Sequence, residues 1–413
     1  MIKWMLFLIL TFSISGIAAT NLEAQEHRLD EHIAQEFGMP FALNYLEASR
    51  VHDEMWVLFP RSQEGELVYP TYYGGHFFCD KGGFVFKVVG SLMAEAQTGV
   101  FAELLKKDSV EVRAVEFSHL DLISTLNAIC HFVSDNPDNE LKIATWGLDT
   151  PGNIVVVQMQ KLNEETEAAF KRDVIDSPMV TLEEGGPVKT LVPQENEEPD
   201  FPATQEVVLT DSDKTSHLQP GGRIYINNFG FSAGYPAERK PETGFVTALH
   251  GLPLEEQEVR LGSQSGPVIG DVTGPIHNGG SADGAFIAMH QSLFDRTVDN
   301  RTLLHSDMRP AHGMILTSVS TPPDNVTRTQ RNVVVTNSNF RADLGGGLVL
   351  TDMIQTTGHA LYGESGGIVF RPIGSDAQVK GVIVGSDGDS VTGDNMFFSW
   401  SETINREINV TQP

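Results

Sequence analysis

Cysteine is scarce in this chain, whose 413 residues include only Cys79 and Cys130. Neither belongs to a CxxC pair, and no HExxH or similar ligand spacing occurs, so the motifs predict neither a metal site nor a cofactor. In an oxidising compartment the two cysteines could form a disulfide, and the sequence leaves that question open. Because both lie in the N-terminal half, the C-terminal half must fold without a disulfide.

Basic residues are few as well, with 28 Lys and Arg against 55 Asp and Glu and a net charge of −27. Such an acidic protein gains nothing from a phosphate backbone, which argues against nucleic acid as a partner. The remaining composition, 40% hydrophobic and 20% charged, is ordinary for a globular protein and excludes a wholly disordered chain. A length of 413 residues favours two or three domains.

Long hydrophobic runs are absent after the N-terminus. There, Lys3 is followed by a short apolar run at 4–17 and by small residues at 16–19, the arrangement of a secretory signal peptide. The run is too short to span a bilayer comfortably. We therefore predict a signal peptide at 1–19 and a secreted protein with no membrane association after signal cleavage. Three sequons fit a secreted glycoprotein: Asn300, Asn325 and Asn409.

Three segments with different patterns precede the C-terminal half. Residues 20–135 mix helical and strand-like stretches without a chemical motif, and we interpret them as an N-terminal pro-region of unknown role. Residues 136–192 contain two strand-like runs, a helical stretch and a third strand-like piece at 188–192, which indicates an α+β pro-subdomain. Residues 193–220 are rich in proline and acidic residues, so they form a linker that cannot fold alone and where cleavage concentrates.

The C-terminal half, residues 221–413, has a different character. It consists of short apolar runs separated by turns rich in Gly, Pro and Asn. Many short strands with turn signals are typical of an all-β sandwich or barrel. The final stretch, 399–410, is predicted to be a terminal helix.

Ser365 is the first candidate for chemistry, and it lies in the string YGESGGIVF at 362–370. Glycines on both sides of it allow a strained turn and the close approach of a substrate backbone. The string resembles the GDSGG nucleophile loop of chymotrypsin-like serine proteases. Because an ordinary Gly-rich hairpin would look the same, this interpretation depends on partner residues elsewhere in the chain.

Two further strings supply those partners. His250 ends GFVTALH, which resembles the GFVTAGHC segment around the histidine of alpha-lytic-type proteases. Asp283 lies in ADGAFIA, which resembles the DAAFV strand that carries the aspartate of that family. The order His, Asp, Ser is that of chymotrypsin-like proteases, whereas the esterase fold places its serine first. We therefore predict that His250, Asp283 and Ser365 form a catalytic triad.

The wider resemblance is to the alpha-lytic endopeptidase and streptogrisin group, and it extends over residues 221–413. GGRIY at 221–225 resembles the mature N-terminus of that group, and Trp146, Asp149 and Asn153 resemble positions of its C-terminal pro-subdomain. The resemblance implies a catalytic domain of two six-stranded antiparallel β-barrels with a C-terminal helix, preceded by an α+β pro-region. It also implies that the pro-region is an intramolecular partner, which assists folding and inhibits the site until it is removed.

The same resemblance assigns roles within the site. The serine attacks the peptide carbonyl, the histidine acts as base and then as acid, and the aspartate orients the histidine. The amides of Gly363 and Ser365 would form the oxyanion hole. The implied substrates are polypeptides, bound by Val384, Gly385, Ser386, Tyr362 and His359. Because no carboxylate falls near His359, we expect an apolar or small residue before the scissile bond.

Four positions depart from the family pattern: Leu249, Gly251, Glu364 and Val384. Gly251 removes the usual disulfide beside the histidine. Glu364 replaces an aspartate that a cation normally holds, and the sequence does not identify its partner. Val384 replaces a serine that commonly hydrogen-bonds the triad aspartate. The leading hypothesis is a secreted serine endopeptidase made as a zymogen and acting through an acyl-enzyme, and the alternative is an inactive protease homologue that acts as a binding protein.

Overall fold

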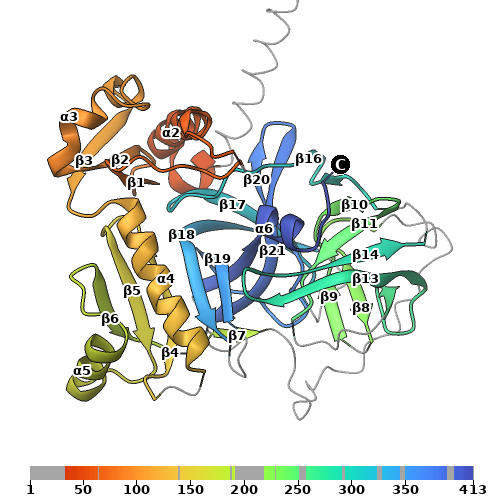
Figure 1. Cartoon of the computed structure of the whole chain (residues 1–413). Helices are drawn as coiled ribbons and strands as arrows, with labels where there is room; N and C mark the ends of the chain where they lie inside the picture. Colours follow the sequence, from red (N-terminus) through yellow and green to blue (C-terminus); the bar gives the residue numbers. More distant parts are fainter. Residues whose placement is uncertain are drawn as a thin grey trace, which may run out of the picture.

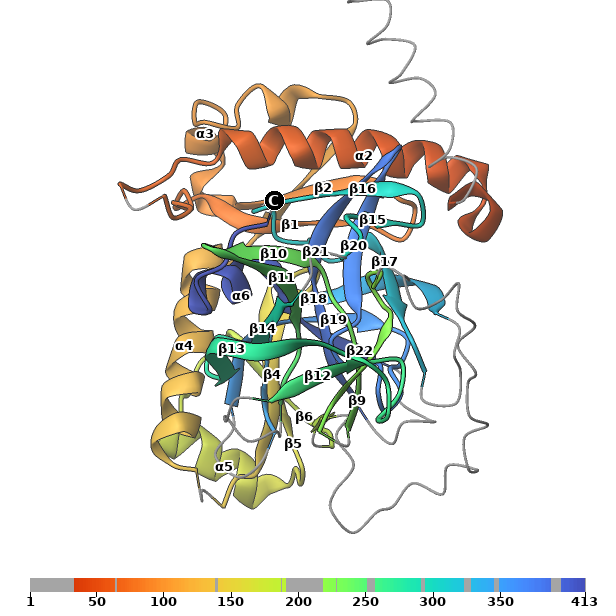
Figure 2. The ribbon, with the colours of Figure 1, turned by 90° about the vertical axis from the view of Figure 1, so that its right-hand side faces the viewer.

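Figures 1 and 2 show the computed structural model of the chain from two directions. It describes residues 33–412 apart from one set of positions: 64, 138–139, 187, 191–217, 228, 251–256, 291–293, 323–327, 345–348 and 388–394. The predicted signal peptide and nearly all of the predicted linker therefore lie outside the described residues. Of the helices within the described ranges, none is both long and apolar enough to cross a membrane.

Six strands of the C-terminal half close into an antiparallel barrel, which lies at the centre of Figure 1. The pairing runs β17-β18-β19-β22-β21-β20, and β20 pairs with β17 to complete the ring. The strands are β17 (Ile315–Ser320), β18 (Thr329–Asp343), β19 (Val349–Thr357), β20 (Ile368–Ile373), β21 (Asp376–Asp387) and β22 (Asn395–Trp400). This ring is the second of the two predicted barrels.

The first barrel precedes it in the chain and is paired in the order β10-β11-β14-β13-β12-β8-β9. Its strands are β8 (Arg223–Ile226), β9 (Phe229–Ser232), β10 (Pro236–Arg239), β11 (Glu242–Thr247), β12 (Glu258–Leu261), β13 (Val268–Gly279) and β14 (Ala282–Met289). Between β9 and β10 the backbone bonds to both sides, because Ala233 N donates to Gly222 O and Gly234 N donates to Val246 O. β9 and β10 thus act as one bent strand that closes a six-membered ring, and the predicted fold class is confirmed.

A shared apolar cluster joins the two barrels and the C-terminal helix α6 (Ser401–Glu407). Val246 and Phe286 reach it from the first barrel, Ile368 and Val382 from the second, and Ile404 from α6. All five side chains are buried. Because interiors of this kind pack as densely as organic crystals, the barrels are held at a defined separation, and residues at their junction keep a defined geometry. A short hairpin, β15 (Thr297–Val298) and β16 (Arg301–Leu304), lies between the barrels in sequence, and β16 pairs in parallel with β21.

Residues 33–115 form a first N-terminal unit against the second barrel. A three-stranded sheet in the order β1-β2-β3 carries the long helix α2, with short helical turns between β2 and β3. The elements are α2 (Met39–Leu58), β1 (Tyr73–Phe78), β2 (Phe84–Val89), α3 (Met93–Ala96) and β3 (Val110–Val115). Figure 2 shows α2 lying across the top of the molecule, over β2 and β16.

Residues 116–190 form a second unit with its own apolar core. The elements are α4 (His119–Asp135), β4 (Ile143–Asp149), β5 (Ile154–Met159), α5 (Glu164–Asp173) and β6 (Val180–Glu184). Helix α4 begins at a capping box formed by Ser118 and Asp121, and its Leu126 and Ile129 pack against Trp146. We therefore propose that this subdomain begins near residue 116, because a boundary at 135 would separate α4 from the sheet it covers.

One strand differs from the prediction made for this subdomain. The third strand of its sheet is β6, which pairs in parallel with β5, and not the piece at 188–192. That piece begins with β7 (Val188–Thr190), which leaves the subdomain and pairs with β21 of the second barrel. The error arose because 188–192 is the more apolar run, while β6 takes its place by pairing with β5 rather than by its own hydrophobicity. Cys79 and Cys130 are free thiols, so no disulfide forms between them.

Three buried histidines lie where the two N-terminal units meet the second barrel. The rings of His52 and His76 are 5.1 Å apart, and His119 packs 4.5 Å from the ring of Tyr69. Burial lowers the pKa of all three, that of His76 most strongly and that of His119 to about 4. The cations nearby act in the same direction, since Arg309 faces His119, while Arg371 and Lys380 face His52 against the single carboxylate Asp53.

These histidines predict loss of stability in acid. The unfolded chain takes up protons at a pKa near 6.5 while the folded chain excludes them, so stability is complete above pH 6.5 and falls as the pH drops toward 4. His119 alone contributes about 3 kcal/mol to this loss. We expect His119→Phe to flatten the dependence of Tm on pH between 7.5 and 4.5, and His290→Gln, which changes an exposed histidine, to leave it unchanged. Equal slopes for all three proteins would contradict this account.

Candidate active site

The three predicted triad residues meet at the junction of the barrels. His250 follows the end of β11, Asp283 lies in β14, and Ser365 lies in the loop before β20. Ser365 Oγ is 3.1 Å from His250 Nε2, and His250 Nδ1 is hydrogen-bonded to Asp283 Oδ2. The sequence-predicted partners are therefore brought together in the order that the chemistry requires.

Asp283 is held in place by hydrogen bonds to its carboxylate and from its backbone. Leu249 N donates to Asp283 Oδ1 at 3.0 Å, and Asp283 N donates to Ser399 Oγ at 3.0 Å. With His250 on the second carboxylate oxygen, both oxygens have a donor although the side chain is fully buried. In the neutral imidazole whose Nδ1–H donates to Asp283, Nε2 of His250 carries no proton and can accept one from Ser365.

Glycine is required at two positions of the nucleophile loop. Gly363 has φ 81° and Gly366 has φ 84°, a region that side chains with a Cβ rarely adopt. A Cβ at Gly363 would meet Arg223 Nη1 at 2.2 Å, because that guanidinium donates to Gly363 O at 3.0 Å. Ser232 Oγ donates to the same carbonyl at 3.1 Å. The first barrel therefore fixes the peptide plane between Gly363 and Glu364, one residue before Ser365.

Glu364 finds its cation in the second barrel. Arg331 Nη1, on β18, donates to Glu364 Oε2 at 2.9 Å, and Leu361 N donates to the same oxygen at 2.7 Å. Ser320 Oγ, at the end of β17, donates to Glu364 Oε1 at 3.0 Å. Although Glu364 is fully buried, its charge is paired and both oxygens are bonded, so the extra methylene is accommodated.

The predicted substrate-binding residues lie in two places. Val384, Gly385 and Ser386 lie on β21, and Val384 O is 3.4 Å from Ser365 Oγ. Tyr362 is half-buried and packs against the core that the second barrel shares with residues 33–115. His359 is also half-buried, and its carbonyl accepts from Arg331.

Strand β7 occupies the edge of β21 that is predicted to bind the substrate backbone. It pairs antiparallel with β21, with Thr190 opposite Gly385, Lys189 opposite Ser386 and Val188 opposite Asp387. The Val188 side chain is buried in a cluster that includes Val384. Along β7 the register therefore moves toward Val384 and the serine. His250, Asp283 and Ser365 are each 0% exposed, so the triad is closed to solvent in this state.

Sequence reasoning missed several residues that hold this site. Arg331 and Ser320 bind Glu364, Ser399 binds the backbone of Asp283, and Arg223 binds the nucleophile loop. Ser399 had been placed at the start of the terminal helix, whereas it lies in β22. None of these residues has a local motif, because each is far from its partner in the chain and meets it only when the barrels close.

Two closed six-stranded antiparallel barrels with a His–Asp–Ser line at their junction define the chymotrypsin-like class of fold, and the predicted resemblance to that class is confirmed. A family model described as "Pro-like C-terminal domain" matches residues 121–185, which fall in the unit from α4 to β6. A comparison with curated proteins gave no match.

Three similar solved structures are bacterial proteases. Thermobifida fusca protease A shares 22% identity over 47% of this chain and 97% of its own, with a TM-score of 0.36. Nocardiopsis protease shares 19% over 47% of this chain and 97% of its own, with a TM-score of 0.38. Cellulomonas bogoriensis chymotrypsin shares 20% over 48% of this chain and 98% of its own, with a TM-score of 0.36.

The buried pair of Glu364 and Arg331 yields a stability prediction. Glu364→Gln keeps the size of the side chain but leaves the Arg331 guanidinium without its charge partner. The position of the lost carboxylate is fully buried, so water cannot replace it. We expect the free energy of unfolding to fall by about 3 kcal/mol. Glu258→Gln, which breaks an exposed pair with Arg260, should cost less than about 1 kcal/mol. Urea unfolding measures both, and similar losses in the two variants would contradict a structural role for Glu364.

Proposed function

We propose that this protein is a secreted serine endopeptidase that acts through an acyl-enzyme. The observation that carries the proposal is the unbroken line from Asp283 through His250 to Ser365 Oγ, with hydrogen bonds at both steps. The proposal is also supported by three of the four departures from the family pattern, because each of these has a partner in this chain, while Gly251 lies outside the described residues. Leu249 supplies its amide to Asp283, Glu364 is paired with Arg331, and Val384 supplies its carbonyl next to Ser365.

The proposed reaction has two halves. His250 Nε2 takes the hydroxyl proton as Ser365 Oγ bonds to the peptide carbonyl carbon, and the amides of Gly363 and Ser365 are proposed to bind the resulting oxyanion. His250 then gives that proton to the leaving nitrogen as the C–N bond breaks, which leaves an ester on Ser365. Water, deprotonated by His250, attacks the ester, and the serine oxygen recovers the proton as it leaves.

The closed triad supports a precursor form. β7 lies antiparallel on the same stretch of β21 that is predicted to bind the substrate backbone, and its direction leads toward Ser365. We propose that this segment inhibits the site within the same chain, and that cleavage in the stretch around 193–220 starts activation. Main-chain pairing with an exposed strand is a common mode of peptide recognition, so the same edge can hold a substrate once β7 has left.

Labelling by a fluorophosphonate tests the nucleophile directly. We expect the secreted, matured protein to be labelled, and we expect Ser365→Ala to abolish labelling because it removes the attacking oxygen. His250→Ala should slow labelling by at least about a hundredfold because the serine loses its base. Labelling that persists in Ser365→Ala would refute the assignment. No labelling of the parent protein would favour the inactive homologue.

Strand β21, which is predicted to bind the substrate backbone, also bears on which residue is preferred before the scissile bond. On β21, Asp387 is the described carboxylate nearest in sequence to the predicted substrate-binding residues, and its Oδ1 already accepts from Asn395 N at 2.8 Å. The residues that follow β7 in sequence, Leu191 and Val192, are apolar. We therefore expect an apolar or small residue before the scissile bond in a peptide-library profile. A profile dominated by Arg or Lys would show that a carboxylate lines the pocket after all.

A further inference from the structure

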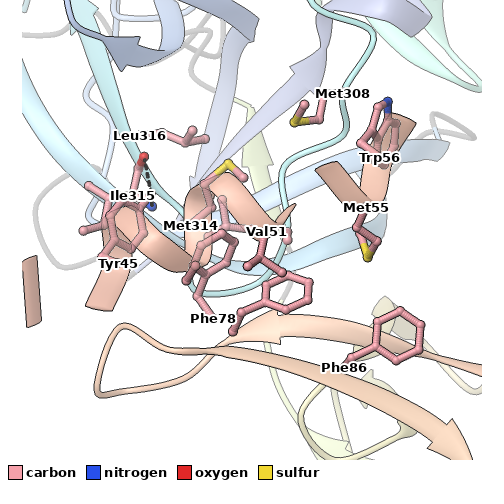
Figure 3. Close-up of a cluster of buried hydrophobic side chains, with 14 of the residues drawn as sticks. Tyr45, Val51, Met55, Trp56, Phe78, Phe86, Met308, Met314, Ile315 and Leu316 are labelled. Carbon is pink, nitrogen blue, oxygen red and sulfur yellow. Dashed lines mark hydrogen bonds between the residues drawn. The ribbon is translucent and has the colours of Figure 1, made fainter. Parts of the chain in front are cut away.

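The two N-terminal units contact the catalytic barrels in different ways. Most buried apolar side chains of residues 33–115 belong to one cluster with those of the second barrel, so the apolar core of this unit is continuous with the barrel. Figure 3 shows Tyr45 and Val51 of α2 near Ile315 and Met314, and Trp56 of the same helix on the side of Met308. The unit 116–190 has a core cluster of its own, which among the described barrel residues includes the partly buried Val349.

Hydrogen bonds make the first of these contacts specific. Ile315 N donates to Tyr45 Oη at 2.9 Å, and Phe78 N donates to His312 O at 2.9 Å. Gly313 has φ 78°, and a Cβ there would lie 2.2 Å from Phe78 O, so the backbones of β1 and of the segment before β17 are in direct contact. This part of the second barrel therefore fits closely against residues 33–115.

A buried cation strengthens the same conclusion. Arg371 lies on β20, the strand that follows Ser365, and its side chain is 5% exposed. Its ion pair is with Asp53 of α2, at 2.6 Å. Although burial raises the pKa of Asp53, the hydrogen bond from His52 and the charge of Arg371 lower it to about 2, so the pair is ionised at neutral pH. Removing residues 33–115 would leave Arg371 and the apolar side chains around it uncovered.

The second unit is attached to the second barrel by strand edges, and to residues 33–115 by Lys87 Nζ, which donates to Pro151 O at 3.1 Å. β4 pairs with β18 over three residues, and β7 pairs with β21 over three more. Arg341 adds hydrogen bonds to Leu126 O and Asn127 Oδ1 of α4. Edge pairing of this length can be exchanged for another strand, and the substrate must displace β7 with its buried Val188 in any case.

From this asymmetry we propose that residues 33–115 are a permanent subunit of the mature protease. After the chain is cut they stay on the second barrel, and only the unit 116–190 leaves. The active species is then a non-covalent complex of two chains. The proposal rests on the proposed function for its two cuts, one in the stretch around 193–220 and one at the link near the exposed Glu116, both ordinary peptide hydrolysis.

The first test uses the matured wild-type protein. It is labelled with a fluorophosphonate, separated by gel filtration, and analysed by intact mass. We expect the labelled fraction to contain a second chain that covers residues 33–115. A labelled catalytic chain that elutes alone would overturn the proposal and leave the protease function standing. No labelling would count against the protease function only, and the second test then decides the proposal.

The second test does not depend on activity. Full-length Ser365→Ala receives the recognition sequence of a site-specific protease within 193–217, is cut after folding, and is diluted during gel filtration. We expect the N-terminal piece to stay bound, and Asp53→Asn to weaken its binding at least about tenfold. Glu54→Gln is the matched control, because Glu54 pairs with Lys107 inside the same unit, and it should change binding less than about twofold. Free separation of the two pieces without any substitution, or a loss caused by Arg341→Met and not by Asp53→Asn, would overturn the proposal.

Discussion

The site depends on the burial of one carboxylate. Asp283 is fully buried at the junction of the barrels, where an ionised group without partners would be strongly unfavourable. Its carboxylate is bonded by Leu249 N and His250, which follow β11 of the first barrel, while its backbone N donates to Ser399 in β22 of the second. The triad therefore forms only when the two barrels have closed and docked, which ties the geometry of the chemistry to the packing of the whole catalytic half.

Strand β21 contacts both Ser365 and β7, the segment proposed to inhibit the site. It pairs with β20 and β22 inside the barrel, places Val384 O beside Ser365, and offers its remaining edge to β7. The same backbone groups that hold β7 are those predicted to hold a substrate. In the proposed precursor, inhibition and substrate recognition would compete for one set of hydrogen bonds, so the proposed activation needs no rearrangement of the triad.

The N-terminal half consists of two units with different physical roles. Residues 33–115 complete an apolar core that the second barrel leaves open on one side, and the Asp53–Arg371 pair crosses the same contact. Residues 116–190 fold around their own core and extend the barrel sheet through β4 and β18. The three histidines lie where these parts meet.

The sequence by itself determined the all-β character of residues 221–413 and their terminal helix, and it predicted that His250, Asp283 and Ser365 act together. These are local properties, because strand-like runs, turns and the glycines around Ser365 are patterns of adjacent residues. Only the tertiary structure decided that Arg331 holds Glu364, that Ser399 holds Asp283, and that β7 lies on β21 instead of in its own subdomain. Each of those depends on strand pairing or barrel closure between residues far apart in the chain, and no local pattern records which distant partner will satisfy a buried charge or an open strand edge.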